Sequence, residues 1–258
     1  HTVFHEPKTK GISLQIGSGK VIRDISGVEV VDNFRMKDIA LGGQGAPLVP
    51  VGEHFIYPEY DTFLNLGGIC NISIHTQNNI QAWDIAPCNQ VLNHFAQLKS
   101  LPYDHGGQLA KSGNVDANWL KALHSLDYFK LPPPKSLSNQ WTKKVLEGSP
   151  AKVENALCTY TQFLAEVISE PLIAAESTSK SMLISGGGAF NNTLIEALAK
   201  ELNTQVSLTI PDEQVVAFKE AIIFAFLGLL RKLNIPNVYA SVTGAQRDSV
   251  SGDLHTVG

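Results

Sequence analysis

The stretch SMLISGGGAFNN, residues 181–192, decides the fold class that this sequence predicts. A short apolar run that ends in three glycines is typical of a buried strand followed by a tight turn. A helix to about Leu202, the strand QVSLTI and an apolar helix over 215–233 come next. This alternation of strands and helices predicts an α/β fold.

The rest of the chain predicts further strands and helices. The alternating residues of ISLQIGSGKVIRDISG predict a β-hairpin around Gly17-Ser18-Gly19. Strands are predicted in VEVVDNF, TFLNLGGICNISIH and IQAWDIAP, the last two joined by a polar turn at residues 77–79. Apolar spacing predicts helices over 91–101, 115–126, 138–146 and 153–175.

Prolines and glycines are expected to shape three segments. Pro171 is expected to interrupt the long helix, because proline cannot donate the helical hydrogen bond. YFKLPPPKS, residues 128–136, predicts an extended polyproline-like connector. The glycine-rich residues 41–52 predict an irregular loop that is either mobile or ligand-facing.

Composition and charge argue against several classes of protein. The 258 residues are 43% hydrophobic and 17% charged, which supports a packed core. The net charge of −4, without a block of one sign, argues against a nucleic-acid partner. The longest apolar stretch, residues 221–230, is about half the ~20 residues needed to cross a bilayer, so no membrane partner is expected. Three cysteines without a C-x-x-C pair predict no zinc site and favour the cytoplasm.

Two glycine elements are candidates for binding phosphate. The turn Gly186-Gly187-Gly188 leaves backbone N–H groups without side chains in the way, although a packing role for these glycines is the alternative. In LNLGGICNIS, the glycines Gly67 and Gly68 interrupt a strand near Asn71. Such an interruption marks either a structural bulge or a backbone that approaches a ligand. Together the two elements predict a clamp for a phosphate and a nucleoside.

Asp84 is the candidate catalytic residue. It ends the predicted strand IQAWD, just before a predicted helix, and ligands of open α/β sheets bind at such junctions. An aspartate in this place can act as a general base. The alternative is a helix N-cap, for which Asn89 is the better candidate because it is closer to the helical run.

Other polar residues are weaker candidates. Arg35 and Asp38 are three residues apart, a spacing more often typical of a surface ion pair, although Arg35 could bind a sugar or carboxylate beside the glycine loop. Glu220 adjoins an almost wholly apolar helix, where an acid is rarely buried without a function; the alternative is a residue near the helix start that the helix dipole favours. Cys70 and Cys88 are interpreted as packing residues.

Motifs across nearly the whole chain resemble the anhydro-N-acetylmuramic acid kinases, which belong to the sugar kinase–Hsp70–actin superfamily. They occur in the family's order: HTVFHEP, VEVVDNFRMKD, GGQGAPLVP, LNLGGICNIS, WDIAPCN, YDHGGQLAKSG, PPPKS, LISGGGAFN, FKEAIIFAFLG and SVTGA. The resemblance implies a two-domain α/β fold of the actin and hexokinase type with ribonuclease-H-like sheets. It also implies ATP and Mg²⁺ in the cleft, and an enzyme of peptidoglycan recycling. Such kinases open the 1,6-anhydro ring with water and phosphorylate O6 of the sugar, giving N-acetylmuramic acid 6-phosphate.

The resemblance also assigns roles to individual residues. Asp84 corresponds to the family's catalytic aspartate, which activates the attacking water. Gly67, Gly68 and Asn71 match the second phosphate-facing element, and Gly186 to Gly188 match the turn on the adenosine side. Four further positions match the sugar pocket: His1, Thr2, Arg35 and Glu220. No protein metal site is assigned, and the partners implied are a small sugar and, as a further candidate, a second copy of the chain.

The sequence departs from the family at two places. The usual Asp-Thr-Gly-Pro-Gly-Asn turn reads Asp-Ile-Ala-Pro-Cys-Asn here, over residues 84–89. The family's opening phosphate loop of the Gly-Thr-Ser-x-Asp-Gly type has no counterpart in these 258 residues. We therefore expect an upstream extension, with 1–58 as the remainder of an incomplete N-terminal domain and 59–258 as the C-terminal domain. Two alternatives stay open: a non-catalytic remnant that binds sugar or nucleotide, and a kinase for another amino sugar.

Overall fold

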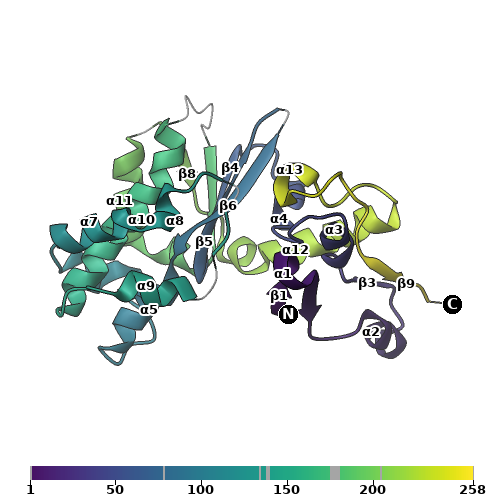
Figure 1. Cartoon of the computed structure of the whole chain (residues 1–258), viewed down its shortest axis with the longest axis horizontal. Coiled ribbons are helices and arrows are strands. Elements are labelled where there is room, and N and C mark those ends of the chain that lie inside the picture. The colour runs from purple at the N-terminus through teal and green to yellow at the C-terminus, as the bar shows by residue number, and fades with distance from the viewer. Residues whose placement is uncertain are drawn as a thin grey trace. The chain divides into compact units, whose positions relative to one another are not determined.

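The computed structural model describes residues 2–77, 79–133, 135–137, 140–174, 181–203 and 205–257, and Figure 1 shows its helices and strands. The chain divides into two compact units. Unit 1 comprises His1–Pro58, His75–Gln81 and Phe218–Gly258, and unit 2 comprises Glu59–Ile74 and Ala82–Ala217. The expected division places 59–258 in one domain, whereas the residues from Phe218 onward pack within unit 1.

A five-stranded sheet forms the centre of unit 2. Its strands are β4 (Thr62–Leu66), β5 (Ile69–His75), β6 (Ile80–Pro87), β7 (Ser181–Ser185) and β8 (Ser207–Thr209), in the order β6-β5-β4-β7-β8. β5 is antiparallel to β4, and β7 is parallel to both β4 and β8. This order is that of the ribonuclease-H-like sheet, and it confirms the predicted α/β class.

Helices cover this sheet. They are α5 (Asn89–Gln97), α6 (Gln108–Lys111), α7 (Ala117–Ser125), α8 (Asp127–Lys130), α9 (Gln140–Leu146), α10 (Val153–Ala174) and α11 (Asn192–Leu202), with 3-10 turns η1 (His105–Gly107) and η2 (Gly187–Phe190). α10 packs against α5, α6, α7 and α11. Its Tyr160 and Phe163 are fully buried in the core with Leu64 and Ile184 from the sheet.

Two proline predictions differ from the structure. α10 is not interrupted at Pro171 but continues to Ala174. Pro171 lies close to the end of α10 and removes one backbone hydrogen bond. The helix continues past it because the apolar residues of α10 are buried against the core. The first three residues of the predicted polyproline connector, Tyr128, Phe129 and Lys130, are also helical and lie in α8. The Tyr128 ring is buried, and its aromatic neighbours Phe129 and Trp141 stabilise this helical turn.

Unit 1 contains shorter elements. They are β1 (Thr2–Glu6), α1 (Pro7–Lys10), β2 (Ile12–Gln15), α2 (Gly19–Ser26), β3 (Val30–Asp32), α3 (Met36–Ala40), α4 (Val49–Ile56), α13 (Ala240–Thr243) and β9 (Asp253–His255), together with most of α12 (Glu213–Lys232). β1 pairs with β2 and β3 pairs with β9, both antiparallel. A small core of α12, α4 and neighbouring residues holds the unit: Phe34, Leu48, Val51, Ile223, Leu227, Leu230 and Val238.

The predicted hairpin around Gly17-Ser18-Gly19 is wrong. β2 ends at Gln15 and pairs with β1, and α2 begins at Gly19. Ser18 is the N-cap of α2, with its Oγ accepting a hydrogen bond from Val21 N at 3.5 Å. Gly19 is required because a Cβ there would lie 2.6 Å from the Asp32 carboxylate, which accepts a bond from Gly19 N.

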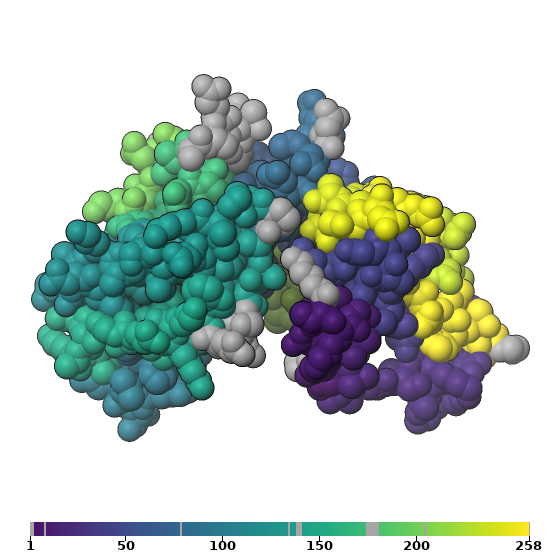
Figure 2. Space-filling model, in the orientation of Figure 1, coloured from purple at the N-terminus to yellow at the C-terminus, as the bar shows by residue number. Residues whose placement is uncertain are grey.

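The predicted glycine loop is irregular over residues 41–48, and α4 then begins at Val49. Figure 2 shows the C-terminal segment, in yellow, against the indigo residues near this loop. Two backbone hydrogen bonds join them: Gln44 N donates to Thr243 O, and Gln246 N donates to Leu41 O, each at 3.0 Å. Within the described residues, no helix is both long enough and apolar enough to cross a membrane.

Candidate functional site

The two predicted glycine elements lie together at one edge of the sheet of unit 2. β4 and β7 are parallel neighbours, with Asn65 opposite Ser185. Gly67 directly follows β4 through Leu66, and Gly186 directly follows β7, so both turns leave the carboxyl ends of their strands. Open α/β sheets present ligands at such an edge. The structure therefore brings the two glycine elements together, as the sequence predicts.

The Gly67-Gly68 pair forms a turn between two strands rather than a bulge within one strand. It connects β4 to β5, and its carbonyl oxygens accept hydrogen bonds from the start of α5. Gly68 O accepts from Cys88 N at 2.8 Å, and Gly67 O accepts from Asn89 N at 3.0 Å. These bonds satisfy backbone donors that a helix leaves unpaired at its first turn. The end of β6 is thereby held at the same edge as the glycine turns.

The three glycines after β7 serve different purposes. Gly186 has φ +81° and ψ 163°, which is a conformation essentially restricted to glycine. A Cβ on Gly186 would lie 2.5 Å from Asn65 Oδ1, and one on Gly188 would lie 2.7 Å from Leu66 Cβ. A Cβ on Gly187 would have its nearest neighbour, Asn89 Nδ2, at 3.8 Å. Gly187 is therefore the glycine of this turn with room beside it.

Asparagine side chains border the glycine turns. Asn89 Nδ2 donates to Leu66 O at 2.8 Å and so ties α5 to the end of β4. Asn89 is the first residue of α5 and makes no capping hydrogen bond, which differs from the expected N-cap role. Asn71 is half-buried in β5, where it pairs across the hairpin with Asn65. Asn65 and Asn89 thus contact the glycine turns, whereas Asn71 lies one strand away as the partner of Asn65.

Asp84 lies inside β6 rather than at its end, because Ile85, Ala86 and Pro87 continue the strand. Its Oδ2 accepts a hydrogen bond from Leu137 N at 2.8 Å, and its backbone N donates to Lys135 O at 3.1 Å. The Tyr128 hydroxyl donates to Asp84 O at 2.6 Å. Asp84 therefore binds the segment after α8 and does not cap α5, so the N-cap alternative is wrong.

The surroundings of Asp84 strengthen its carboxylate as a base. Burial raises the pKa of Asp84, and the hydrogen bond from Leu137 N partly opposes this effect. Among the described residues, Oδ1 has no hydrogen-bond partner. A half-buried carboxylate with one oxygen held and the other available suits proton transfer. Burial also raises the pKa of Cys88 to about 12 and that of Cys70 well above its usual range, which fits inert packing thiols.

The predicted surface ion pair of Arg35 and Asp38 does not form. Asp38 is fully buried, and its Oδ2 accepts a hydrogen bond from Gly45 N at 2.7 Å. Its Oδ1 accepts from the Thr243 hydroxyl, also at 2.7 Å. Arg35 Nη1 donates instead to Gly45 O at 2.5 Å. Both side chains hold the glycine loop, because the loop offers a backbone donor and a backbone acceptor at Gly45.

Arg35 and Glu220 both belong to unit 1 and interact electrostatically. Burial lowers the pKa of the Arg35 guanidinium, and the negative charge of Glu220 opposes that effect. Glu220 is exposed on α12, inside the helix rather than at its first residue. Thr2 starts β1, while His1 lies outside the described residues. Of the four predicted sugar-pocket residues, Arg35 and Glu220 are thus the two that interact electrostatically.

Sequence reasoning missed His5, which lies beside this group. His5 Nδ1 is 3.0 Å from Ser13 Oγ, across the pairing of β1 and β2. Partial burial and the charge of Arg35 lower the pKa of His5. The imidazole is therefore favoured in its neutral form, which can accept or donate a hydrogen bond. In the sequence, the only feature that pointed to His5 was its place in the motif HTVFHEP, which resembles the family.

A buried charged group was also missed. Lys219 Nζ lies 2.5 Å from Glu53 Oε1, and His75 Nε2 lies 3.9 Å from Glu53 Oε2. All three residues are buried. Lys219 precedes the buried Ile223 and Leu227 by four and eight residues, so it occupies a position on the apolar face of α12. That position was the signal available in the sequence.

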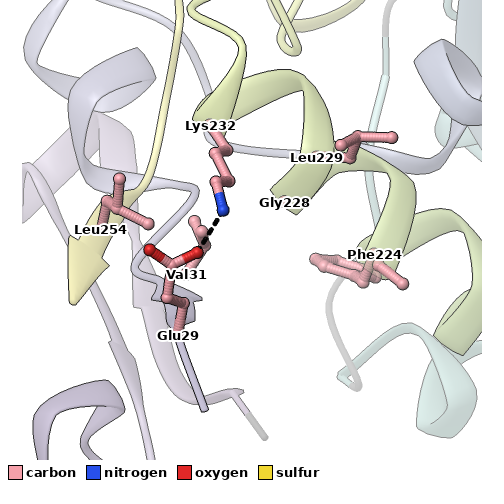
Figure 3. Close-up of a pocket in the computed structure, with 8 residues that line it drawn as sticks. Glu29, Val31, Phe224, Gly228, Leu229, Lys232 and Leu254 are labelled. Atoms are coloured by element: carbon pink, nitrogen blue, oxygen red, sulfur yellow. Dashed lines mark hydrogen bonds and ion pairs between the residues drawn. The ribbon is translucent and has the colours of Figure 1, made fainter. Parts of the chain in front are cut away.

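A separate pocket of about 280 Å³ opens on unit 1 (Figure 3). Its lining includes Val31, Phe224, Leu229 and Leu254, and Glu29 forms an ion pair with Lys232 at one side. None of the predicted site residues that the structure describes lines it. The pocket is thus distinct from the Arg35–Glu220 group.

A family model and the curated relatives that this chain matches carry the same description. The family model described as anhydro-N-acetylmuramic acid kinase matches residues 1–256. A Photobacterium profundum protein of that name is 34% identical over 263 residues, covering 95% of this chain and 70% of that protein. A Vibrio cholerae protein of the same name is 37% identical over 267 residues, covering 98% and 72%.

Solved structures give a weaker likeness. The activator of the 2-hydroxyisocaproyl-CoA dehydratase from Clostridium difficile with bound ADPNP has a TM-score of 0.41 and 19% identity to this chain. The likeness covers 69% of this chain and 67% of that one. A TM-score at this level supports no conclusion about the present protein.

Proposed function

Because the chain belongs to the anhydro-N-acetylmuramic acid kinase family, we propose that it is an ATP-dependent kinase for 1,6-anhydro-N-acetylmuramic acid. In this proposal water opens the anhydro ring, O6 receives the γ-phosphoryl group, and the product is N-acetylmuramic acid 6-phosphate. The reaction would serve peptidoglycan recycling in the cytoplasm. The observation that carries the proposal is the family match over residues 1–256.

Asp84 is proposed as the general base. Its carboxylate takes a proton from the water that attacks the anomeric carbon, and the bond from that carbon to O6 breaks. Burial makes Asp84 more basic than an exposed aspartate, while Leu137 N holds Oδ2 in a fixed direction. The Oδ1 atom is the proposed proton acceptor, because among the described residues it has no other partner.

The edge of unit 2 is proposed as the nucleotide site. Gly67, Gly68 and Asn71 would face the phosphates, and the turn from Gly186 to Gly188 would face the adenosine. The space beside Gly187 fits this assignment, because a backbone without a side chain allows close approach of a ligand. ATP supplies the phosphoryl group when it is bound.

Magnesium is proposed to enter with ATP. Among the described residues, no group of three or more His, Cys, Asp or Glu side chains could hold a metal ion. Mg²⁺ in phosphoryl-transfer enzymes is commonly bound through substrate phosphates with few protein ligands. We therefore assign no protein residue as a metal ligand.

The sugar site is proposed to include Arg35 and Glu220, with Thr2 and His1 as further members. The guanidinium can donate two parallel hydrogen bonds to the carboxylate of a muramic acid, and Glu220 can accept from a sugar hydroxyl. We also propose that units 1 and 2 are the two domains of the kinase, with unit 1 contributing the sugar-binding residues.

Asp84→Asn in the native protein tests the role of Asp84. The amide keeps the shape and can still accept from Leu137 N, so we expect turnover of 1,6-anhydro-N-acetylmuramic acid to fall by about 10²–10⁴-fold. The melting temperature should stay close to that of the wild type. Asp127→Asn is the matched control, because the Asp127 side chain is 98% exposed in the same unit. Near-normal turnover by Asp84→Asn would contradict the assignment.

A further inference from the structure

α4 and α12 meet at two consecutive residues of α4. A Cβ on Gly52 would lie 2.5 Å from Ile223 Cγ2, so the helices touch closely at this point. The next residue, Glu53, pairs with Lys219, which lies one helical turn before Ile223. Lys219 and Ile223 therefore share the face of α12 that packs on α4. We refer to these four residues as the α4–α12 seam.

The ionic part of the seam is well removed from water. The side chains of Glu53 and Lys219 are 5% and 4% exposed, and His75 lies 3.9 Å from the second oxygen of Glu53. A buried ion pair loses much of its attraction to the cost of removing charges from water, and an apolar pair of similar size is often as stable. Stability alone therefore gives little reason for charges at this place. A directional pair can instead specify one helix register.

The residue next to Lys219 is Glu220. Successive residues of an α-helix point about 100° apart, so the direction of Lys219 determines the direction of Glu220. Lys219 is buried and pairs with Glu53 of α4, while Glu220 is exposed and its negative charge raises the pKa of Arg35 against the effect of burial. A small rotation or slide of α12 would move Glu220 relative to Arg35.

We propose that Lys219 and Glu53 are positioning residues that fix the register of α12 on α4 and so hold Glu220 in place for the sugar. The inference rests on the proposed function, because it takes Glu220 as part of the sugar site. Apolar packing by Ile223 alone would tolerate small slides of the helix. The 2.5 Å pair at Glu53 fixes both the rotation and the height of α12.

The test compares Glu53→Leu, Lys219→Met and the double variant in the native protein. The measurements are the melting temperature, the Kd for 1,6-anhydro-N-acetylmuramic acid by calorimetry, and KM and kcat. Each single variant leaves a buried charge without its partner and should be destabilised. The double variant should recover most of the stability, because the ionic pair is replaced by an apolar one. It should still bind the sugar about 10–100-fold more weakly, since Glu220 is no longer held.

Two matched variants make the comparison specific. Lys232→Met breaks the exposed Glu29–Lys232 pair on the same helix and should leave sugar affinity unchanged. Glu53→Gln keeps the shape of the side chain but weakens its bond to Lys219 by removing the negative charge, so it disturbs the seam more mildly and serves if the double variant is unstable. For Glu53→Gln, the fold-increase in KM for the sugar should exceed the fold-decrease in kcat. The Kd for ATP should be unchanged throughout.

The outcomes separate the inference from the proposed function. Wild-type protein that neither binds nor converts the anhydro sugar refutes the proposed function and this inference with it. Wild-type binding together with unchanged sugar affinity in the folded double variant, or in Glu53→Gln, refutes the inference alone. In that case the seam would be a purely structural contact.

Discussion

The glycine turns of unit 2 and the glycine loop of unit 1 are held by different parts of the chain. In unit 2 the carbonyls of Gly67 and Gly68 accept hydrogen bonds from backbone N–H groups of α5. In unit 1 the loop is held by side chains, because Asp38 accepts from Gly45 N and Arg35 donates to Gly45 O. The Gly67-Gly68 turn therefore depends on the path of the backbone around it, and the loop of unit 1 depends on the identity of two side chains.

This difference explains how the turn of residues 84–89 can have unusual side chains and keep its backbone contacts. The turn of residues 84–89 reads Asp-Ile-Ala-Pro-Cys-Asn, without the two glycines and the hydroxyl that the family usually has. Its last two residues nevertheless donate to Gly68 O and Gly67 O through their backbone N–H groups. A turn held by its backbone tolerates new side chains, whereas the loop of unit 1 should not tolerate loss of Asp38.

Asp38→Ala should therefore give the largest effect. It removes a buried carboxylate that accepts two hydrogen bonds, so the donors Gly45 N and the Thr243 hydroxyl both lose their acceptor. We expect the free energy of unfolding to fall by about 3–5 kcal/mol, measured by urea denaturation. Hydrogen exchange at the Gly45 amide should also speed up, because this amide donates to Asp38 Oδ2. Asp24→Ala, at an exposed pair in the same unit, should leave both quantities unchanged. Equal losses in the two variants would contradict the comparison.

Gly186→Ala should have the next largest effect, through the backbone alone. Its positive φ and the contacts of the new Cβ with Asn65 and Leu66 predict a loss of about 2–4 kcal/mol in unfolding free energy. Gly187→Ala is the matched variant, because a Cβ there meets nothing closer than 3.8 Å. Its stability should stay within about 0.5 kcal/mol of the wild type.

The Gly187 variants also test the nucleotide assignment. A bulky residue at Gly187 should weaken ATP binding and leave sugar binding largely intact, measured by calorimetry for each ligand. Equal loss of both affinities in a folded variant would count against placing the adenosine at this turn.

The pH dependence of Asp84 should be the smallest effect. Burial raises its pKa in the folded state, so the folded protein binds this proton more tightly than the unfolded chain does. The stability of the wild type relative to Asp84→Asn should therefore fall as pH rises above the usual aspartate pKa. It should level off once the folded carboxyl is ionised. Urea denaturation of both proteins between about pH 3 and pH 7 gives this difference, and a rise with pH would contradict the direction of the shift.

The parts of the fold that could be predicted depend on local patterns. The strand before Gly186, the helix after it and the apolar face of α12 each follow from residues close in sequence. The hairpin around Gly17 failed for a local reason as well. Two glycines around Ser18 indicated a turn, although Val21, Ile22 and Ile25 have helical spacing and Ser18 is a good N-cap.

The polar contacts of unit 1 could not be predicted, because their partners are distant in sequence. Asp38 and its partner Thr243 are 205 residues apart, and Glu53 and Lys219 are 166 residues apart. At Arg35 and Asp38 the three-residue spacing favoured a local pair that does not form. Asp84 was found correctly as a strand residue, but its bond to Leu137 N, 53 residues away, depends on tertiary folding.

The tryptophan fluorescence of the protein reports on only one of its two units. All three tryptophans, Trp83, Trp119 and Trp141, belong to unit 2. Their fluorescence therefore follows the unfolding of unit 2, whereas far-ultraviolet circular dichroism follows the helices of both units. Coincident transitions in the two signals would mean that the chain unfolds as one cooperative system. An offset between them would give the stability of unit 1 separately, from the unmodified protein and without an added fluorophore.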